Sequence, residues 1–105
     1  MSGWYMYVLR CGDDSFYTGV TNDVERRFSE HAAGRGGRYT RAHLPVTLIG
    51  VWEYADRAEA MRAEASFKTL THADKAHRIH AREAFRDGSF VPELLETIES
   101  ADSSC

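Results

Sequence analysis

Two tyrosines near the start of the chain stand where a short hairpin would bring their rings together. Tyr7 lies in an aromatic and β-branched stretch, Trp4 to Cys11, and Tyr17 lies in a second one, Phe16 to Thr21. Both compositions are typical of strands, and the Gly-Asp-Asp-Ser stretch between them has turn chemistry. A phenol can take part in acid–base catalysis, although tyrosines on a hairpin also serve as plain packing residues.

Arg27 and His31 are one helical turn apart, so they lie on the same side of any helix that contains both. Residues 23–33 are predicted to form that helix, because Thr21 or Asn22 is a natural N-cap. The pair falls beside the apolar stripe of this helix and not on its solvent side. An arginine there can bind phosphate through its planar guanidinium. Alternatively, both side chains snorkel at the helix edge.

A second helix is predicted from the cap formed by Asp56 and Glu59 to about Leu70. Within it, Glu64 and Lys68 lie on the same arc as the apolar residues. One interpretation is an ordinary i,i+4 ion pair, which contributes roughly 0.2–0.5 kcal/mol. The other is a functional carboxylate, since an acid on an inward-facing arc is costly to desolvate.

The charge of the chain is unevenly distributed. The net charge of −3 argues against a protein that coats nucleic acid non-specifically. Residues 26–43 nevertheless contain five arginines and one acid. Three of them, Arg35, Arg38 and Arg41, fall in a glycine-rich stretch, Gly34 to Pro45, that is predicted to be an irregular loop. These three are candidates for contacting a phosphate-bearing partner, and solvated arginines in a mobile loop are the alternative.

The remaining segments complete an α+β pattern. A third strand is predicted over Thr47 to Tyr54, a third helix from Thr71 to about Asp87, and a short amphipathic helix from Pro92. The order β-β-α-β-α-α, with the short last helix, predicts a small three-stranded antiparallel or mixed sheet flanked by helices. Residues 1–80 would form the main domain, and residues 81–105 a helical extension of it.

Length and composition restrict the class of protein. With 105 residues, the chain is expected to form one domain with its own core. Its two cysteines, Cys11 and Cys105, form no CxxC pair, so neither a zinc site nor a disulfide framework is indicated. The longest apolar run, Trp4 to Leu9, is far shorter than the roughly 20 residues that span a bilayer. We therefore expect a soluble, cytoplasmic protein that does not interact with membranes.

Taken together, these features resemble the GIY-YIG nuclease superfamily. The first signature triplet appears as Tyr5-Met6-Tyr7 and the second as Tyr17-Thr18-Gly19. The stretches TGVTNDVERRFSEHAAGRG, TLIGVWEY and RAEASFKTLTHADKAHRI are similar to those of the small, stand-alone members. The resemblance covers about Trp4 to Ile79 and implies an endonuclease that hydrolyses phosphodiester bonds, with DNA repair as one setting.

The resemblance also implies a role for each matching residue. Tyr7 corresponds to the candidate general base that activates a water, and Tyr17 to the tyrosine that positions this water or the phosphate. Arg27 corresponds to the arginine that binds the scissile phosphate. His31 corresponds to a partner in proton transfer. Because tyrosine is a poor base at its reference pKa of about 10, Tyr7 would need positive charge nearby, and His31 is the alternative base.

By the same resemblance, Glu64 is the ligand of a single divalent metal, Mg²⁺ or Mn²⁺, and Lys68 is a nearby charge that steers phosphate. The implied partner is DNA, including branched, damaged or single-stranded DNA, with RNA left open. The family's larger members carry a separate DNA-binding domain, so specificity here would come from this domain, from a protein partner, or from the shape of the nucleic acid.

One departure from the family pattern motivates an alternative function. Some family nucleases use an asparagine near the end of the domain, whereas the single asparagine here is Asn22, at the predicted helix cap. The alternative is therefore a non-catalytic module that binds nucleic acid or protein on a nuclease scaffold. The position of Glu64 favours the enzyme, because a binding module has little reason to keep a carboxylate on an inward arc.

Overall fold

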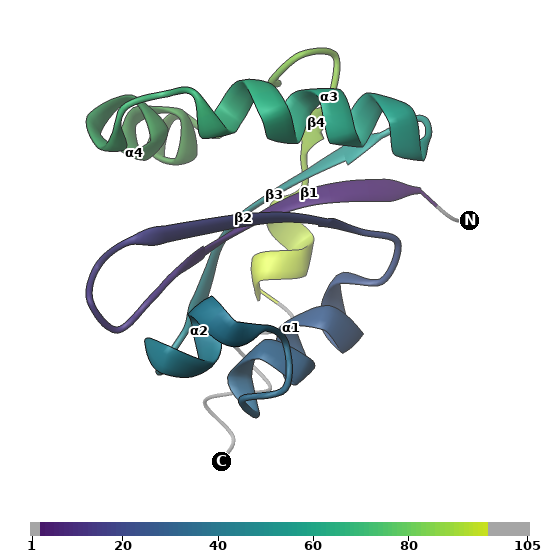
Figure 1. Cartoon of the computed structure of the whole chain (residues 1–105). Coiled ribbons are helices and arrows are strands. Elements are labelled where there is room, and N and C mark those ends of the chain that lie inside the picture. Colours follow the sequence, from purple (N-terminus) through teal and green to yellow (C-terminus); the bar gives the residue numbers. More distant parts are fainter. Residues whose placement is uncertain (1–2, 97–105) are drawn as a thin grey trace.

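A four-stranded antiparallel sheet runs through the middle of the molecule, with helices on both faces (Figure 1). The computed structural model describes residues 3–96. In chain order the elements are β1 (Trp4–Arg10), β2 (Phe16–Thr21), α1 (Val24–Ala32), α2 (Arg38–Ala42), β3 (Thr47–Tyr54), α3 (Arg57–Lys68), α4 (His72–Ala81) and β4 (Ser89–Phe90). Residues 92–96 are helical as well.

The strands are ordered β2-β1-β3-β4, so β1 lies inside the sheet and β2 forms one edge. Successive side chains of β1 alternate between two apolar clusters, as the pleat requires. Tyr7 and Leu9 belong to the cluster on the α1 side, and Met6 and Val8 to the cluster on the α3 side. All four are buried. The alternation therefore places the side chains of Tyr7 and Tyr17 on the face of the sheet that α1 covers.

The helices form two layers, with α3 and α4 on one face of the sheet and α1 and α2 on the other (Figure 1). In α3, Ala60, Ala63 and Phe67 are fully buried, and the Phe67 ring lies 5.7 Å from that of Trp52. The two alanines allow the helix to approach the sheet closely. Burying a side chain such as Phe67 stabilises the fold by roughly 1.5–3 kcal/mol. This packing fixes the position of α3 over the sheet.

The prediction of three strands was wrong, and the order of elements differs from the expected one. The stretch predicted to be an irregular loop contains α2, and Thr40 in this helix is fully buried. The third helix was predicted to reach Asp87, whereas α4 ends at Ala81 because Arg82 adopts a left-handed conformation with φ of 56°. The chain then turns back and adds β4 to the edge of β3.

Two side chains of β3 hold this return segment in place. The Trp52 Nε1–H donates to the Glu83 carbonyl (2.9 Å), and the Tyr54 hydroxyl donates to the Phe85 carbonyl (2.7 Å). Both contacts link positions 31 residues apart in the sequence. They stabilise a turn in place of the last two turns of the predicted helix.

Other predicted elements agree with the structure. The third strand spans Thr47–Tyr54. The carboxylate of Asp56 caps α3 by accepting from the Glu59 amide (2.8 Å). The α1 helix begins one residue late, because its N-cap is Asp23, whose side chain accepts from the Arg26 amide. The predicted last helix begins at Pro92, and its part beyond residue 96 lies outside the described residues.

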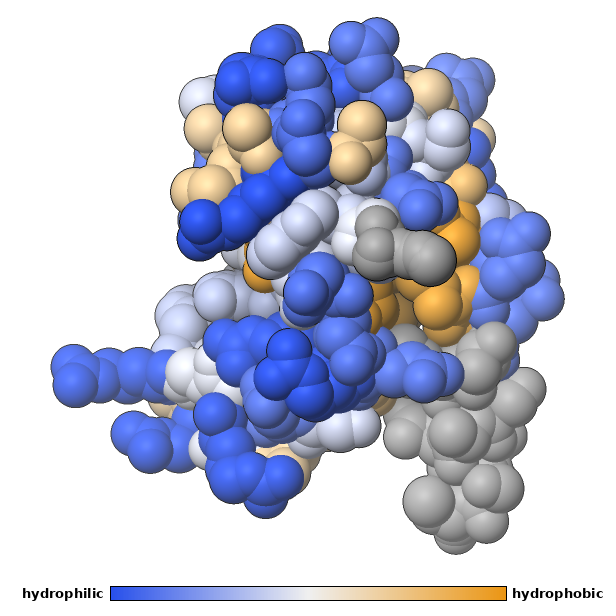
Figure 2. Space-filling view, turned by 90° about the vertical axis from the view of Figure 1, so that its right-hand side faces the viewer, coloured by the Kyte–Doolittle hydropathy of each residue, from blue (hydrophilic) through white to orange (hydrophobic). Residues whose placement is uncertain are grey.

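The surface is largely polar. The face drawn in Figure 2 is mostly hydrophilic, and its most hydrophobic residues, in orange, lie mainly at the middle of the right-hand side. Across residues 3–96, the large apolar side chains that remain exposed are Tyr39, Leu44 and Met61. None of the helices in this part of the chain combines the length and the apolar character needed to cross a bilayer.

Candidate active site

The hairpin brings Tyr7 and Tyr17 together, with their ring centroids 6.5 Å apart. The partner of Tyr7 across the ladder is Gly19. A Cβ atom at Gly19 would overlap the hydroxyl of Tyr7 and two of its ring carbons. The Tyr7 side chain therefore extends across β2 above a residue that has no side chain. The glycine of the second triplet provides the space in which the tyrosine of the first one lies.

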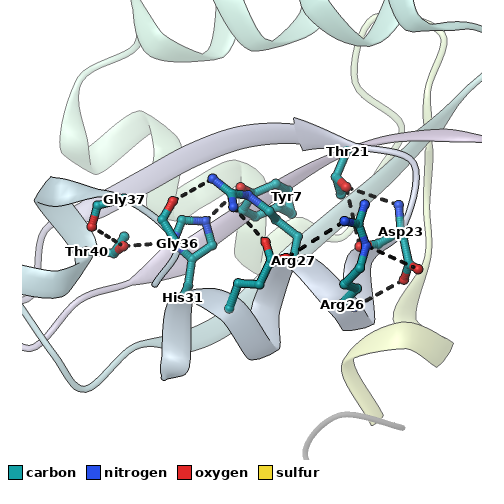
Figure 3. A network of polar contacts seen from close by, with 10 residues as sticks. Tyr7, Thr21, Asp23, Arg26, Arg27, His31, Gly36, Gly37 and Thr40 are labelled. Atoms are coloured by element: carbon teal, nitrogen blue, oxygen red, sulfur yellow. Dashed lines mark hydrogen bonds and ion pairs between the residues drawn. The ribbon is translucent and has the colours of Figure 1, made fainter. Parts of the chain in front are cut away.

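A chain of hydrogen bonds leads from Tyr7 into the protein (Figure 3). The Tyr7 hydroxyl lies 3.0 Å from His31 Nε2, His31 Nδ1 lies 2.8 Å from Thr40 Oγ1, and the Thr40 hydroxyl donates to the Gly37 carbonyl (3.4 Å). Because the Thr40 proton is directed to a carbonyl, its oxygen accepts from Nδ1–H. Nε2 then has a free lone pair and accepts from the Tyr7 hydroxyl. The network thus assigns the tautomer of His31.

Burial keeps the phenol of Tyr7 and the imidazole of His31 neutral. Burial lowers the pKa of His31 from 6.5 to about 4, and the positive charge of Arg27 acts in the same direction. Burial also raises the pKa of Tyr7 to about 12, an effect that Arg27 opposes and that Tyr17 and Glu64 reinforce. At neutral pH, Tyr7 therefore retains its proton and His31 has an empty acceptor site beside it.

Arg27 is held by two hydrogen bonds on one side of α1. One terminal nitrogen donates to Glu30 Oε1 (2.8 Å), and the other donates to the Gly36 carbonyl (2.5 Å). The guanidinium has five N–H donors, and Tyr7 is a further hydrogen-bond partner of this side chain, so donors remain for an anion after these contacts. The side chain lines a surface pocket together with Tyr7 and Tyr17. Arg27 is therefore positioned before any anion arrives.

A pocket of about 630 Å³ joins these groups at the free edge of β2. Tyr7, Tyr17 and Arg27 line it from the α1 side, and Glu64 lines it from α3. Arg57 also reaches it, with its guanidinium 5.7 Å from the centre of the Trp4 ring. The pocket thus combines two phenols, two guanidinium groups and one carboxylate.

The carboxylate of Glu64 suits a hard divalent ion. Its side chain is 21% exposed and pairs with Lys68 Nζ at 3.1 Å. Within residues 3–96, no three His, Cys, Asp or Glu side chains lie close enough together to hold a metal. A closed, zinc-type cage is thus absent from this part of the chain. A single carboxylate beside an open pocket fits Mg²⁺ or Mn²⁺, because Mg²⁺ keeps several waters and often binds one carboxylate together with substrate phosphate.

The other candidates from the sequence lie outside the pocket. Lys68 does not line it and lies on the next turn of α3, paired with Glu64. Arg35, Arg38 and Arg41 are exposed, and none of them lines the pocket. Their proposed contacts with nucleic acid remain a prediction.

Sequence reasoning missed several residues that position the site. Thr40 fixes the histidine tautomer, and the carbonyl of Gly36 holds Arg27. A Cβ atom at Gly36 would overlap the ring of His31, so the glycine-rich stretch was itself a signal of close packing. Neither Thr40 nor Arg57 carried a local signal, because each depends on a contact between distant segments.

Comparisons with known proteins show which family this chain belongs to. The profile described as the GIY-YIG catalytic domain matches residues 3–78. The UPF0213 protein XAC3202 of Xanthomonas axonopodis pv. citri is 47% identical over 101 residues, which cover 96% of this chain and 90% of that protein. A UPF0213 protein of Streptococcus sanguinis is 53% identical over 78 residues, covering 74% of this chain and 90% of its own.

A solved structure is also similar. The solution NMR structure of the UPF0213 protein BH0048 from Bacillus halodurans has a TM-score of 0.51 and 40% sequence identity, and the match covers 78% of this chain and 86% of that one. The matched profile spans the tyrosine hairpin, α1 and Glu64. The chain therefore belongs to the GIY-YIG family.

Proposed function

We propose that this protein is a metal-dependent endonuclease that hydrolyses phosphodiester bonds in DNA. The observation that carries the proposal is the pocket in which Tyr7, Tyr17, Arg27 and Glu64 meet, although the first and last are more than fifty residues apart in sequence. Family membership supports this class of chemistry, and the pocket contains the groups that this chemistry would need. Structure-specific and single-stranded substrates are included in the proposal.

Hydrolysis of a phosphodiester needs a nucleophile, neutralisation of charge on the phosphoryl oxygens, and help for a leaving alkoxide. The remaining N–H groups of Arg27 can bind the phosphoryl oxygens in a bidentate manner. Arg57 adds a second positive charge on the same pocket. A divalent ion, when bound at Glu64, would supply Lewis-acid stabilisation of the phosphate and the leaving oxygen.

The hydrogen-bond chain offers a route for the proton of the attacking water. As the Tyr7 oxygen takes a proton from water, its own proton passes to Nε2 of His31, 3.0 Å away. His31 is a weak acceptor in the free protein, because burial and the charge of Arg27 lower its pKa. An anionic phosphate bound to Arg27 offsets that charge. Substrate binding would therefore remove the smaller of the two causes that lower the pKa of His31, which favours proton transfer to Nε2.

The experiment that tests this function compares matched variants. Purified protein is incubated with labelled DNA and RNA oligonucleotides in Mg²⁺ or Mn²⁺, together with Glu64→Gln and Arg27→Ala. Each variant should lose activity, by about 10²–10³-fold for Arg27→Ala. Arg62→Ala is the control, because Arg62 lies on α3 but pairs with Glu59 outside the pocket. Circular dichroism verifies folding. Cleavage that survives both substitutions would indicate a contaminating nuclease and overturn the proposal.

The non-catalytic alternative predicts a different result in the same assay. A binding module would bind the oligonucleotides but would not cleave them, whichever metal ion is added. Its affinity for them would fall when Arg35, Arg38 and Arg41 are replaced together. The two functions are therefore separated by whether labelled product forms.

A further inference from the structure

A second hollow borders the pocket along the free edge of β2. Its volume is about 260 Å³, and it is lined by Phe16, Tyr17, Thr18, Tyr39, Lys68 and Lys75. Tyr17 lines both this hollow and the pocket. A molecule bound in the hollow would therefore lie directly beside a phosphate held by Arg27. We call this hollow the flanking subsite.

Tyr39 forms one wall of the flanking subsite and is both exposed and held in place. It is 41% exposed, yet its hydroxyl is hydrogen-bonded to Ser15 Oγ, which in turn donates to Asp13. Its ring is stacked with those of Tyr17, with centroids 6.3 Å and planes 16° apart, and of His43, with centroids 4.3 Å and planes 27° apart. The part of the ring that lines the hollow is the part open to a ligand. An exposed aromatic ring that is already fixed loses little conformational entropy when a ligand stacks on it.

The opposite wall of the flanking subsite provides positive charge. Lys68 and Lys75 come from α3 and α4, and Lys75 takes part in none of the ion pairs within residues 3–96. Thr18 also lines the hollow, but its hydroxyl oxygen is shielded from solvent, so the positive charge of the two lysines is what this wall offers to a ligand.

We propose that the flanking subsite binds the nucleotide next to the scissile phosphate, with its base stacked on Tyr39 and its phosphate held by Lys68 and Lys75. The identity of the ligand rests on the proposed nuclease function. An aromatic platform beside a positively charged groove is the combination that holds single strands. Stacking on Tyr39 requires a base that is not paired within a duplex. The subsite therefore selects substrates whose bases are unpaired next to the cut.

The first test measures binding without cleavage. A fluorescein-labelled hexathymidylate is titrated in EDTA, and anisotropy gives the Kd of the wild type, Tyr39→Ala and Tyr39→Phe. Tyr39→Ala should weaken binding about 5- to 150-fold, the loss expected for one stacked base, and Tyr39→Phe should keep most of it. Leu44→Ala is the matched control, since Leu44 is equally exposed at 41%. A Tyr39→Ala protein that binds within twofold of the wild type would overturn the subsite.

The second test separates stacking from a merely structural role. The Kd is measured for a set of hexamers in which one base at a time is removed. In the wild type, removal of the base at one position should weaken binding, and this loss of affinity should disappear in Tyr39→Ala. A penalty that persists in Tyr39→Ala would overturn the assignment of the base to this ring. Lys75→Ala should reduce the slope of log K against log salt by about 0.7, the value for one phosphate contact on a single strand. Arg62→Ala should leave the slope unchanged.

The outcomes distinguish this inference from the proposed function. Binding that depends on Tyr39, in a protein that never cleaves, would keep the subsite and refute the nuclease. Cleavage together with full binding by Tyr39→Ala would refute the subsite and keep the nuclease. A wild-type protein that neither binds nor cleaves any of the oligonucleotides would refute both.

Discussion

His31 should make the stability of the protein depend on pH. The residue is 0% exposed, and its pKa falls from 6.5 in the unfolded chain to about 4 in the folded one. Between these values the unfolded state binds more protons, so acid favours unfolding. The contribution of His31 is fully present above pH 6.5 and is lost progressively as the pH falls toward 4. The pKa difference corresponds to about 3 kcal/mol.

Urea unfolding followed by tryptophan fluorescence at several pH values between 7 and 4 measures this contribution. The relevant quantity is the difference between the wild type and His31→Gln, because carboxylates elsewhere also respond to acid. The wild type should lose about 3 kcal/mol more of its unfolding free energy than His31→Gln. His43→Gln, at a partly exposed loop histidine, should follow the wild type. Parallel curves for the wild type and His31→Gln, or an NMR titration of His31 near pH 6.5, would refute the reasoning.

Three substitutions test the packing around the site. Gly19→Ala should lower the unfolding free energy, measured in urea, by roughly 1–3 kcal/mol, because its methyl group overlaps the Tyr7 ring. Combining it with Tyr7→Leu should remove most of this loss. An unchanged stability of Gly19→Ala would contradict the close approach of the two residues. Thr40→Val should give a mixture of the two His31 tautomers in ¹⁵N NMR spectra, since Nδ1–H loses its acceptor. Thr40→Ser should keep the single tautomer. Spectra of Thr40→Val that match those of the wild type would disprove the assigned hydrogen-bond direction. Phe67→Ala should lower the unfolding free energy by about 3–5 kcal/mol, and a loss below about 1 kcal/mol would mean that α3 is not anchored by this ring.

The parts of the fold that could be predicted from the sequence are those that local chemistry determines. The cap of α3 at Asp56 and the cap of α4 at Thr71 are contacts between residues three apart. The span of β3 follows from its apolar and β-branched run. In contrast, β4 contains two residues that are held by pairing with Trp52 and Glu53. No local pattern in so short a strand distinguishes it from a loop.

The same division applies to the candidate site. Tyr7 and Tyr17 could be placed together because a hairpin fixes their register, and Arg27 and His31 because a helix fixes their side. The bond between His31 and Thr40 depends on the path of the chain after α1, which a glycine-rich stretch leaves open. The five residues of α2 are too few to be stable alone, and burial of Thr40 against His31 compensates.

The free edge of β2 has a consequence for how copies of this protein behave toward one another. Among the described strands, β2 pairs with β1 alone, so its outer edge presents unpaired backbone groups of the kind that recruit a strand from another molecule. Lys68 and Lys75 lie along this edge, and a second copy would bring two like charges against them. The charges that would attract a nucleic acid thus also disfavour edge-to-edge pairing with a second copy of the protein.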